Sequence, residues 1–128
     1  MNSIVLDASA LLALLNREPG ADKLTPDMLS ATVCSTVNLA EVQSKLVARG
    51  LTSDEAWEAT ISPIAEAVAF TAEHAKIAGS LIIQTRALGL SFGDRACLAL
   101  GLALGAPVYT ADKSWKGLRV GLRIHIIR

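Results

Sequence analysis

Four acidic residues lie at the ends of apolar runs or near the starts of helical segments, where carboxylates can contribute to a catalytic site. Asp7 directly follows the apolar run IVL, and Asp112 comes two residues after a second such run, VYT. Glu41 and Asp94 each lie near the start of a segment with helical patterning. Clustered carboxylates repel one another unless a cation lies among them, and Mg²⁺ or Mn²⁺ prefers such oxygen ligands. With a basic flank, this set favours metal-assisted phosphodiester hydrolysis.

Each acid also has a purely structural interpretation. Ser91 and Asp94 have the S-x-x-D spacing of a capping box, and a first-turn carboxylate suits the helix dipole. Asp7 fits a helix cap or a turn, and Glu41 has Lys45 four residues on, the favourable order for a surface ion pair. The last acid, in TADK, fits an ordinary turn. The case for chemistry therefore depends on all four acids sharing one edge of the fold.

Short apolar segments typical of strands alternate along the chain with segments typical of helices. This alternation predicts an α/β fold with a mostly parallel sheet. Strands are expected at 3–6, 31–35, 66–70, 107–110 and 124–127. Helices are expected at 10–16 with Ser9 as the cap, at 21–24, at 37–49, from Thr52 to before Pro63, at 71–87, and after Ser91.

In such a fold, ligands bind outside the carboxyl ends of the strands. Asp7 and Asp112 lie at those ends, and the helix of Glu41 follows a strand and so starts at the same edge. The helix of Asp94 follows another helix, which leaves its starting edge undetermined. If it also begins there, four carboxylates converge.

The whole chain, residues 1–128, has the size and composition of one globular domain, with 52% hydrophobic and 19% charged residues. Its two cysteines exclude a disulfide framework, and we expect Cys34 and Cys97 to be buried free thiols in a reducing compartment. With no recognisable signal peptide and no apolar run long enough to span a bilayer, a soluble cytoplasmic protein without membrane contact is expected.

Positive charge is concentrated in the last third of the chain. Residues 86–128 carry seven basic side chains against two acids, whereas residues 1–85 carry five against ten. This asymmetry favours an anionic partner.

Three stretches, IVLDASALLALL, TVNLAEV and LSFGDRACLALGLALGAPVYTADKSW, together resemble the PIN-domain ribonucleases, and in size and motif order the VapC-type toxins of toxin–antitoxin pairs. The four acids match the family's acids in order and context. Thr110 matches the hydroxyl residue usually found two positions before the last acid, and Ser9 matches a small polar residue near the first.

The resemblance implies a three-layer α/β/α sandwich and an endoribonuclease that needs Mg²⁺ or Mn²⁺. Asp7, Asp94 and Asp112 would hold metal, and Glu41 would act as a ligand or orient the attacking water. One metal ion or two is left open.

The resemblance also implies supporting residues and partners. Ser9 and Thr110 would hydrogen-bond the acids. Arg95, Lys113 and Lys116 lie close in sequence to these acids and either hold the RNA backbone or are ordinary solvated charges. The partners would be RNA, a cognate antitoxin protein and a second copy of the chain.

Two alternatives remain. A haloacid-dehalogenase-like phosphatase also begins with an acid after an apolar strand, but it needs D-x-D where this sequence has Asp7-Ala8-Ser9. A non-catalytic PIN module that binds RNA or a protein partner is the second, and the intact set of four acids argues against it.

Overall fold

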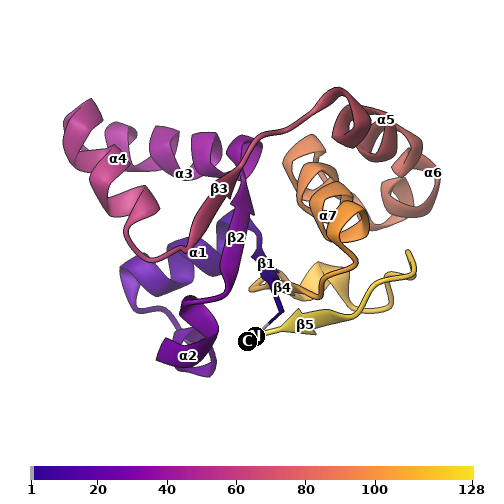
Figure 1. Cartoon of the computed structure of the whole chain (residues 1–128), viewed down its shortest axis with the longest axis horizontal. Coiled ribbons are helices and arrows are strands. Elements are labelled where there is room, and N and C mark those ends of the chain that lie inside the picture. The colour runs from indigo at the N-terminus through magenta and orange to yellow at the C-terminus, as the bar shows by residue number, and fades with distance from the viewer. Residues whose placement is uncertain (1) are drawn as a thin grey trace.

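The fold is built on five short strands that form one sheet, in a computed structural model that describes residues 2–128. The strands are β1 (Ile4–Leu6), β2 (Thr32–Ser35), β3 (Glu66–Val68), β4 (Val108–Thr110) and β5 (Ile124–Ile126). They are ordered β3-β2-β1-β4-β5, and every neighbouring pair is parallel (Figure 1). The predicted parallel α/β sheet is confirmed.

The strand order reverses direction at β1. From β1 the chain steps outward to β2 and β3, then crosses back to β4 on the other side of β1 and continues to β5. Val5 of β1 therefore pairs with both Val33 and Val108. In open parallel sheets, the carboxyl ends of the strands at such a reversal flank a crevice that binds ligands.

Within residues 2–128, seven α-helices cover the two faces of this sheet. They are α1 (Ala8–Asn16), α2 (Pro26–Leu29), α3 (Thr36–Ala48), α4 (Ser53–Ile61), α5 (Ala72–Ser80), α6 (Ile82–Thr85) and α7 (Phe92–Leu104). Figure 1 shows α1, α3 and α4 on one side of the strands and α5, α6 and α7 on the other. Single 3₁₀ turns are formed by η1 (Ala21–Lys23), η2 (Arg86–Leu88) and η3 (Lys113–Trp115). The three-layer α/β/α sandwich is thus confirmed.

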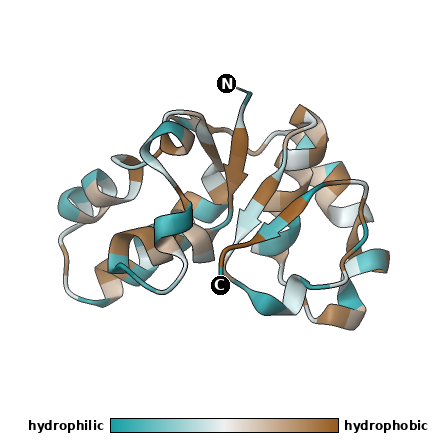
Figure 2. Cartoon of the chain, turned by 90° about the horizontal axis from the view of Figure 1, so that it is seen from below, coloured by the Kyte–Doolittle hydropathy of each residue, from teal (hydrophilic) through white to brown (hydrophobic). Residues whose placement is uncertain are grey.

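Successive residues of a strand pack into the apolar cores on opposite faces of the sheet, because side chains alternate across a sheet. Val5 packs with Leu98 of α7, whereas the next residue, Leu6, packs with Ala10 and Ala13 of α1. In Figure 2 the strand that follows the N-terminus is hydrophobic throughout, while the helices alternate between hydrophobic and hydrophilic residues. The sheet is therefore held between two apolar layers, which fixes the position of its carboxyl-end edge.

The two cysteines contribute to these cores. Cys34 and Cys97 are free and buried, as predicted. Burial raises the pKa of both thiols, and the nearby acids raise it further. Both therefore stay protonated and act as small apolar side chains.

Among residues 2–128, no helix is long and apolar enough to cross a membrane.

One predicted helix is divided. Residues 71–87 form α5, α6 and η2 instead of a single helix. The hydroxyls of Ser80 and Thr85 donate to the carbonyls of Lys76 and Leu81, four residues earlier, at 2.8 Å each. Such back-bonding bends helices.

Two shorter elements also differ from the prediction. Asp7, not Ser9, caps α1, because its carboxylate accepts the backbone N–H of Ala10, and the helix begins two residues earlier than predicted. The short α2 was not predicted at all, although Thr25 caps it and Pro26 stands at its first position, where proline is favoured.

Candidate active site

The position of α7 decides where Asp94 lies. Gly105 ends this helix in the left-handed conformation, with φ +63°, and the chain enters β4 after two more residues. The end of α7 therefore lies near the beginning of β4, and its 13 residues, about 20 Å long, run back toward the carboxyl-end edge. Gly101 allows close packing, since a Cβ there would lie 2.7 Å from a Val108 methyl group.

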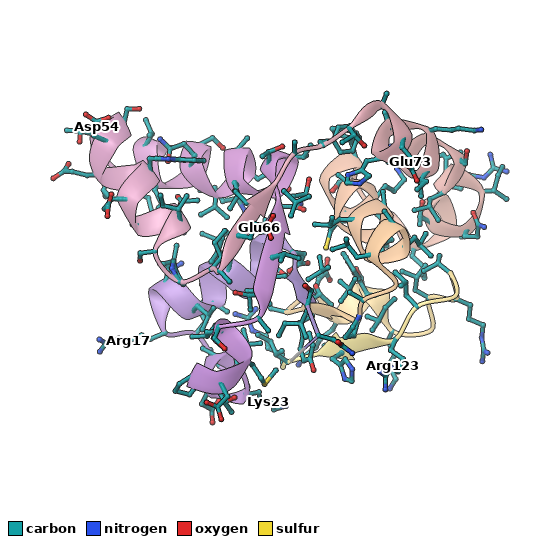
Figure 3. All side chains as sticks on the ribbon, in the orientation of Figure 1. Arg17, Lys23, Asp54, Glu66, Glu73 and Arg123 are labelled. Atoms are coloured by element: carbon teal, nitrogen blue, oxygen red, sulfur yellow. The ribbon has the colours of Figure 1, made fainter. Side chains whose placement is uncertain are left out.

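All four acids line one cleft at this edge. The cleft has a volume of about 340 Å³. Asp7 follows β1, Glu41 lies in α3, Asp94 lies in the first turn of α7 and Asp112 follows β4. Four separate elements thus bring their carboxylates to one hollow. Other charged residues, such as Asp54, instead project from the periphery (Figure 3).

Asp7 is the most enclosed of the four, at 2% exposure. Its Oδ1 accepts the N–H of Ala10 at 2.8 Å, its Oδ2 accepts the Thr110 hydroxyl at 2.5 Å, and the Ser9 hydroxyl reaches both oxygens. Burial raises the pKa of Asp7 to about 6, and the negative charge of Asp94 adds to the rise. The three hydrogen-bond donors oppose it but do not cancel it.

The two hydroxyl residues also fix the segment after β4. The Ser9 Oγ accepts the N–H of Ala111 at 2.9 Å, and the Thr110 Oγ1 accepts the N–H of Asp112 at 3.0 Å. Because each hydroxyl also contacts Asp7, the first and last acids are joined through one hydrogen-bonded unit.

Glu41 is held by two residues that the sequence analysis missed. Asn38 is 1% exposed, and its Nδ2 donates both to Glu41 Oε1 at 2.8 Å and to the Gly93 carbonyl at 2.9 Å. A Cβ on Gly93 would lie 2.3 Å from Glu41 Oε1, so any larger residue at this position would have to displace the Glu41 carboxylate. The signals were present: Asn38 precedes Glu41 by three residues, on the same helix face, and Gly93 immediately precedes Asp94.

The structural interpretations of the acids have mixed outcomes. The Ser91–Asp94 capping box is formed, with both reciprocal hydrogen bonds. Within residues 2–128, however, the Asp94 carboxylate uses only its Oδ2 atom for hydrogen bonding. Asp112 similarly uses Oδ1 to cap η3 by accepting the N–H of Ser114. Glu41 and Lys45 form no ion pair in the described chain. Asp94 and Asp112 therefore each keep one oxygen for another partner.

Comparisons with known proteins agree with this geometry. The profile of the PIN domain family matches residues 4–120. The chain belongs to the PIN domain family. No curated protein matches the sequence of this PIN domain.

Solved structures share the fold of this PIN domain over nearly its whole length. DNA-bound VapBC from Salmonella typhimurium aligns with a TM-score of 0.77 at 17% identity, over 100% of both chains. VapC20 of Mycobacterium tuberculosis, a toxin that cleaves the sarcin–ricin loop, aligns with a TM-score of 0.71 at 24% identity, over 94% of this chain and 99% of its own. VapBC2 from Rickettsia felis, bound to promoter DNA, gives 0.70 at 19% identity, over 94% and 96%.

The donors in the cleft of this PIN domain suit a hard divalent ion. No three His, Cys, Asp or Glu side chains among residues 2–128 form a ready-made metal cage. Mg²⁺ does not require one, because it keeps several waters and uses one or two carboxylates together with substrate phosphate. The buried carboxylate of Asp7, with its raised pKa and no ion-pair partner in that range, is the kind of group that a cation stabilises.

The predicted RNA-binding residues lie outside the cleft of the PIN domain. Arg95 donates from Nη1 to the Ala78 carbonyl at 3.0 Å, and its guanidinium lies 6.0 Å from the centre of the Phe92 ring. Lys113, which begins η3, and Lys116, which directly follows it, are exposed and do not line the cleft. The basic residues that do line it are Lys45, Arg49 and Arg128, none of which was predicted to do so.

Proposed function

We propose that this PIN domain is a metal-dependent endoribonuclease that hydrolyses RNA phosphodiester bonds. The observation that carries the proposal is the meeting of four carboxylates, from four separate elements, in one cleft at the strand reversal. Membership of the PIN family and the fold shared with an RNA-cleaving VapC toxin support it.

In this proposal Asp7, Asp94 and Asp112 hold Mg²⁺ or Mn²⁺, with Glu41 as a further ligand or as the group that orients the attacking water. A divalent cation bound there supplies positive charge that polarises the phosphodiester and makes water a stronger nucleophile at neutral pH. Asp94 and Asp112 each bring the oxygen that their helix caps leave unused.

The remaining steps belong to the chain's own side chains. Ser9 and Thr110 hold the Asp7 carboxylate in one orientation, and Asn38 holds Glu41 so that its carboxylate can position water for attack on phosphorus. Water adds its oxygen to phosphorus, the bond to the leaving oxygen breaks, and that oxygen takes up a proton. Such fixed groups lower the barrier because they need no rearrangement during the reaction.

We further propose that the protein is the toxin of a toxin–antitoxin pair. Its cognate antitoxin protein would mask the cleft, and the toxin would act in the cytoplasm as a homodimer. The shared fold of VapBC complexes supports this assignment. Arg95, Lys113 and Lys116 would contact the RNA backbone beyond the cleft.

The test is cleavage of several RNAs by the purified chain, freed of any partner, in Mg²⁺, Mn²⁺ or EDTA. We expect cleavage with either metal, none in EDTA, and loss of activity in Asp7→Asn with the fold retained. Cleavage by Asp7→Asn at the wild-type rate would place the active site elsewhere. Tight RNA binding without cleavage in either metal would favour the non-catalytic module.

A further inference from the structure

Charges of both signs line the cleft. Four of its lining residues are the carboxylates described above, and the remainder of its lining includes Lys45, Arg49 and Arg128 with Asn16 and Glu18. A cleft that carried only carboxylates would repel a polyanion, whereas cations beside them attract it.

Lys45 and Arg49 continue a row that starts at the active-site acid of α3. Glu41, Lys45 and Arg49 are spaced by four residues, which places their side chains along one face of the helix. Each step advances about 6 Å along the helix axis. The two cations therefore lead away from the acids along the wall of the cleft, and both are exposed.

Neither Lys45 nor Arg49 forms an ion pair with an acid among residues 2–128. Arg49 donates from Nη1 to the neutral amide oxygen of Asn16 at 3.2 Å, and Asn16 in turn donates to Glu18 Oε2 at 3.2 Å. The carboxylate of Glu18 forms its ion pair with Arg128. The hydrogen bond from Asn16, the contact with Arg128 and, as the smallest cause, the charge of Arg49 lower the pKa of Glu18, so this acid stays ionised and is paired with Arg128.

We infer that Lys45 and Arg49 form a phosphate subsite, which binds the RNA backbone phosphate next to the one cleaved. The inference rests on the proposed ribonuclease function and adds where the substrate strand runs: from the four acids along α3 toward Asn16. Asn16 orients the Arg49 guanidinium across the cleft without neutralising it, which leaves the other N–H donors of Arg49 for phosphate oxygens.

The competing explanation is local. Lys45 and Arg49 lie at the C-terminal end of α3, where positive charge stabilises the helix dipole. That role predicts a change in thermal stability and none in RNA binding, so the two explanations separate experimentally.

The experiment compares Lys45→Ala/Arg49→Ala with the matched control Lys23→Ala/Arg123→Ala. The control removes one lysine and one arginine that project from the periphery, away from the cleft (Figure 3). Binding of a labelled single-stranded RNA is measured in EDTA, which stops hydrolysis, across a range of salt concentrations. Hydrolysis of bis(p-nitrophenyl) phosphate, a diester with a single phosphate, is measured in Mn²⁺.

Loss of the contact to this one phosphate should make the slope of log Kd against log salt shallower by about 0.7, the contribution of one neutralised phosphate on a single strand. From 50 to 200 mM salt, Kd of the wild type should then rise about 2.6-fold more than that of the cleft variant. The peripheral control should keep the wild-type slope. The charge-retaining variant Lys45→Arg/Arg49→Lys should keep the wild-type slope as well. That result would show that the loss in the alanine variant comes from the missing charges and not from a damaged fold.

Hydrolysis of the single-phosphate diester should keep most of its rate in the cleft variant, because this substrate has no neighbouring phosphate to occupy the subsite. A wild-type salt slope in Lys45→Ala/Arg49→Ala would overturn the subsite. So would weaker binding of polyglutamate with unchanged RNA binding, which would assign the two cations to an acidic protein partner. Wild-type protein that binds RNA with the expected slope but hydrolyses neither substrate would refute the ribonuclease and leave the subsite standing.

Discussion

Replacing Asp7 by Asn should stabilise the metal-free protein at neutral pH. Burial raises the pKa of Asp7 from 3.8 to about 6 in the folded state. The folded protein therefore binds this proton more tightly than the unfolded chain does. Its free energy of unfolding falls as the pH rises from about 4 to about 6, and the loss persists above that range.

The size of the loss follows from the shift. A rise in pKa from 3.8 to about 6, at 1.36 kcal/mol for each pKa unit, lowers the free energy of unfolding by about 3 kcal/mol at pH 7. Asn carries no charge to desolvate, and its side-chain oxygen can still accept the N–H of Ala10. Asp7→Asn should therefore exceed the wild type by up to about 3 kcal/mol at pH 7 in EDTA, and the two should converge near pH 4.

Urea unfolding at pH 4, 5, 6 and 7 in EDTA measures this difference. The control is Asp54→Asn, which removes the same charge from a residue at the periphery (Figure 3). It should track the wild type across the whole range. An Asp7→Asn protein that is no more stable than the wild type at pH 7, or whose advantage does not grow with pH, would show that the Asp7 carboxylate is not desolvated as described.

Three further predictions concern the other side chains around the cleft. Asp94→Asn should abolish the stabilisation by Mn²⁺, which for the wild type is about 2.7 kcal/mol at a hundredfold excess over Kd; an equal shift in melting temperature would leave this residue as a helix cap alone. Gly93→Ala should displace the Glu41 carboxylate and lower kcat by about a hundredfold, whereas Gly79→Ala, which has open space around it, should not. Thr110→Val removes a hydrogen bond that lowers the pKa of the buried carboxylate, so the acidic limb of the pH–rate profile should move to higher pH; an unmoved limb would contradict this.

Much of the fold could be predicted from the sequence because its signals are local. The Thr52–Glu55 and Ser91–Asp94 capping boxes each join residues within one helical turn, and both form as their spacing predicts. The alternation of strands and helices was enough to predict the parallel sheet and its covering layers. Asp7 and Asp112 were placed at strand ends by the same local reading, without knowledge of their surroundings.

The prediction failed where two local tendencies compete. Residues 71–87 were predicted to form one helix, but Ser80 and Thr85 bond back to carbonyl groups in this stretch and the helix divides. Likewise, Asp7 and Ser9 are both good caps for α1, and the structure uses Asp7. Small energy differences of this kind depend on the packing around the residue.

The sequence by itself was enough to predict four acids that share one edge of the sheet and the elements that carry them. Only the tertiary structure decided how they are supported and which cations accompany them. The amide of Asn38 reaches Gly93, 55 positions away, because α3 and α7 pack together at one edge of the sheet. Lys45 and Arg49, rather than the basic residues nearest the acids in sequence, line the cleft. Spacing along a helix shows which side chains share a face, but the packing of whole helices decides what that face is turned toward.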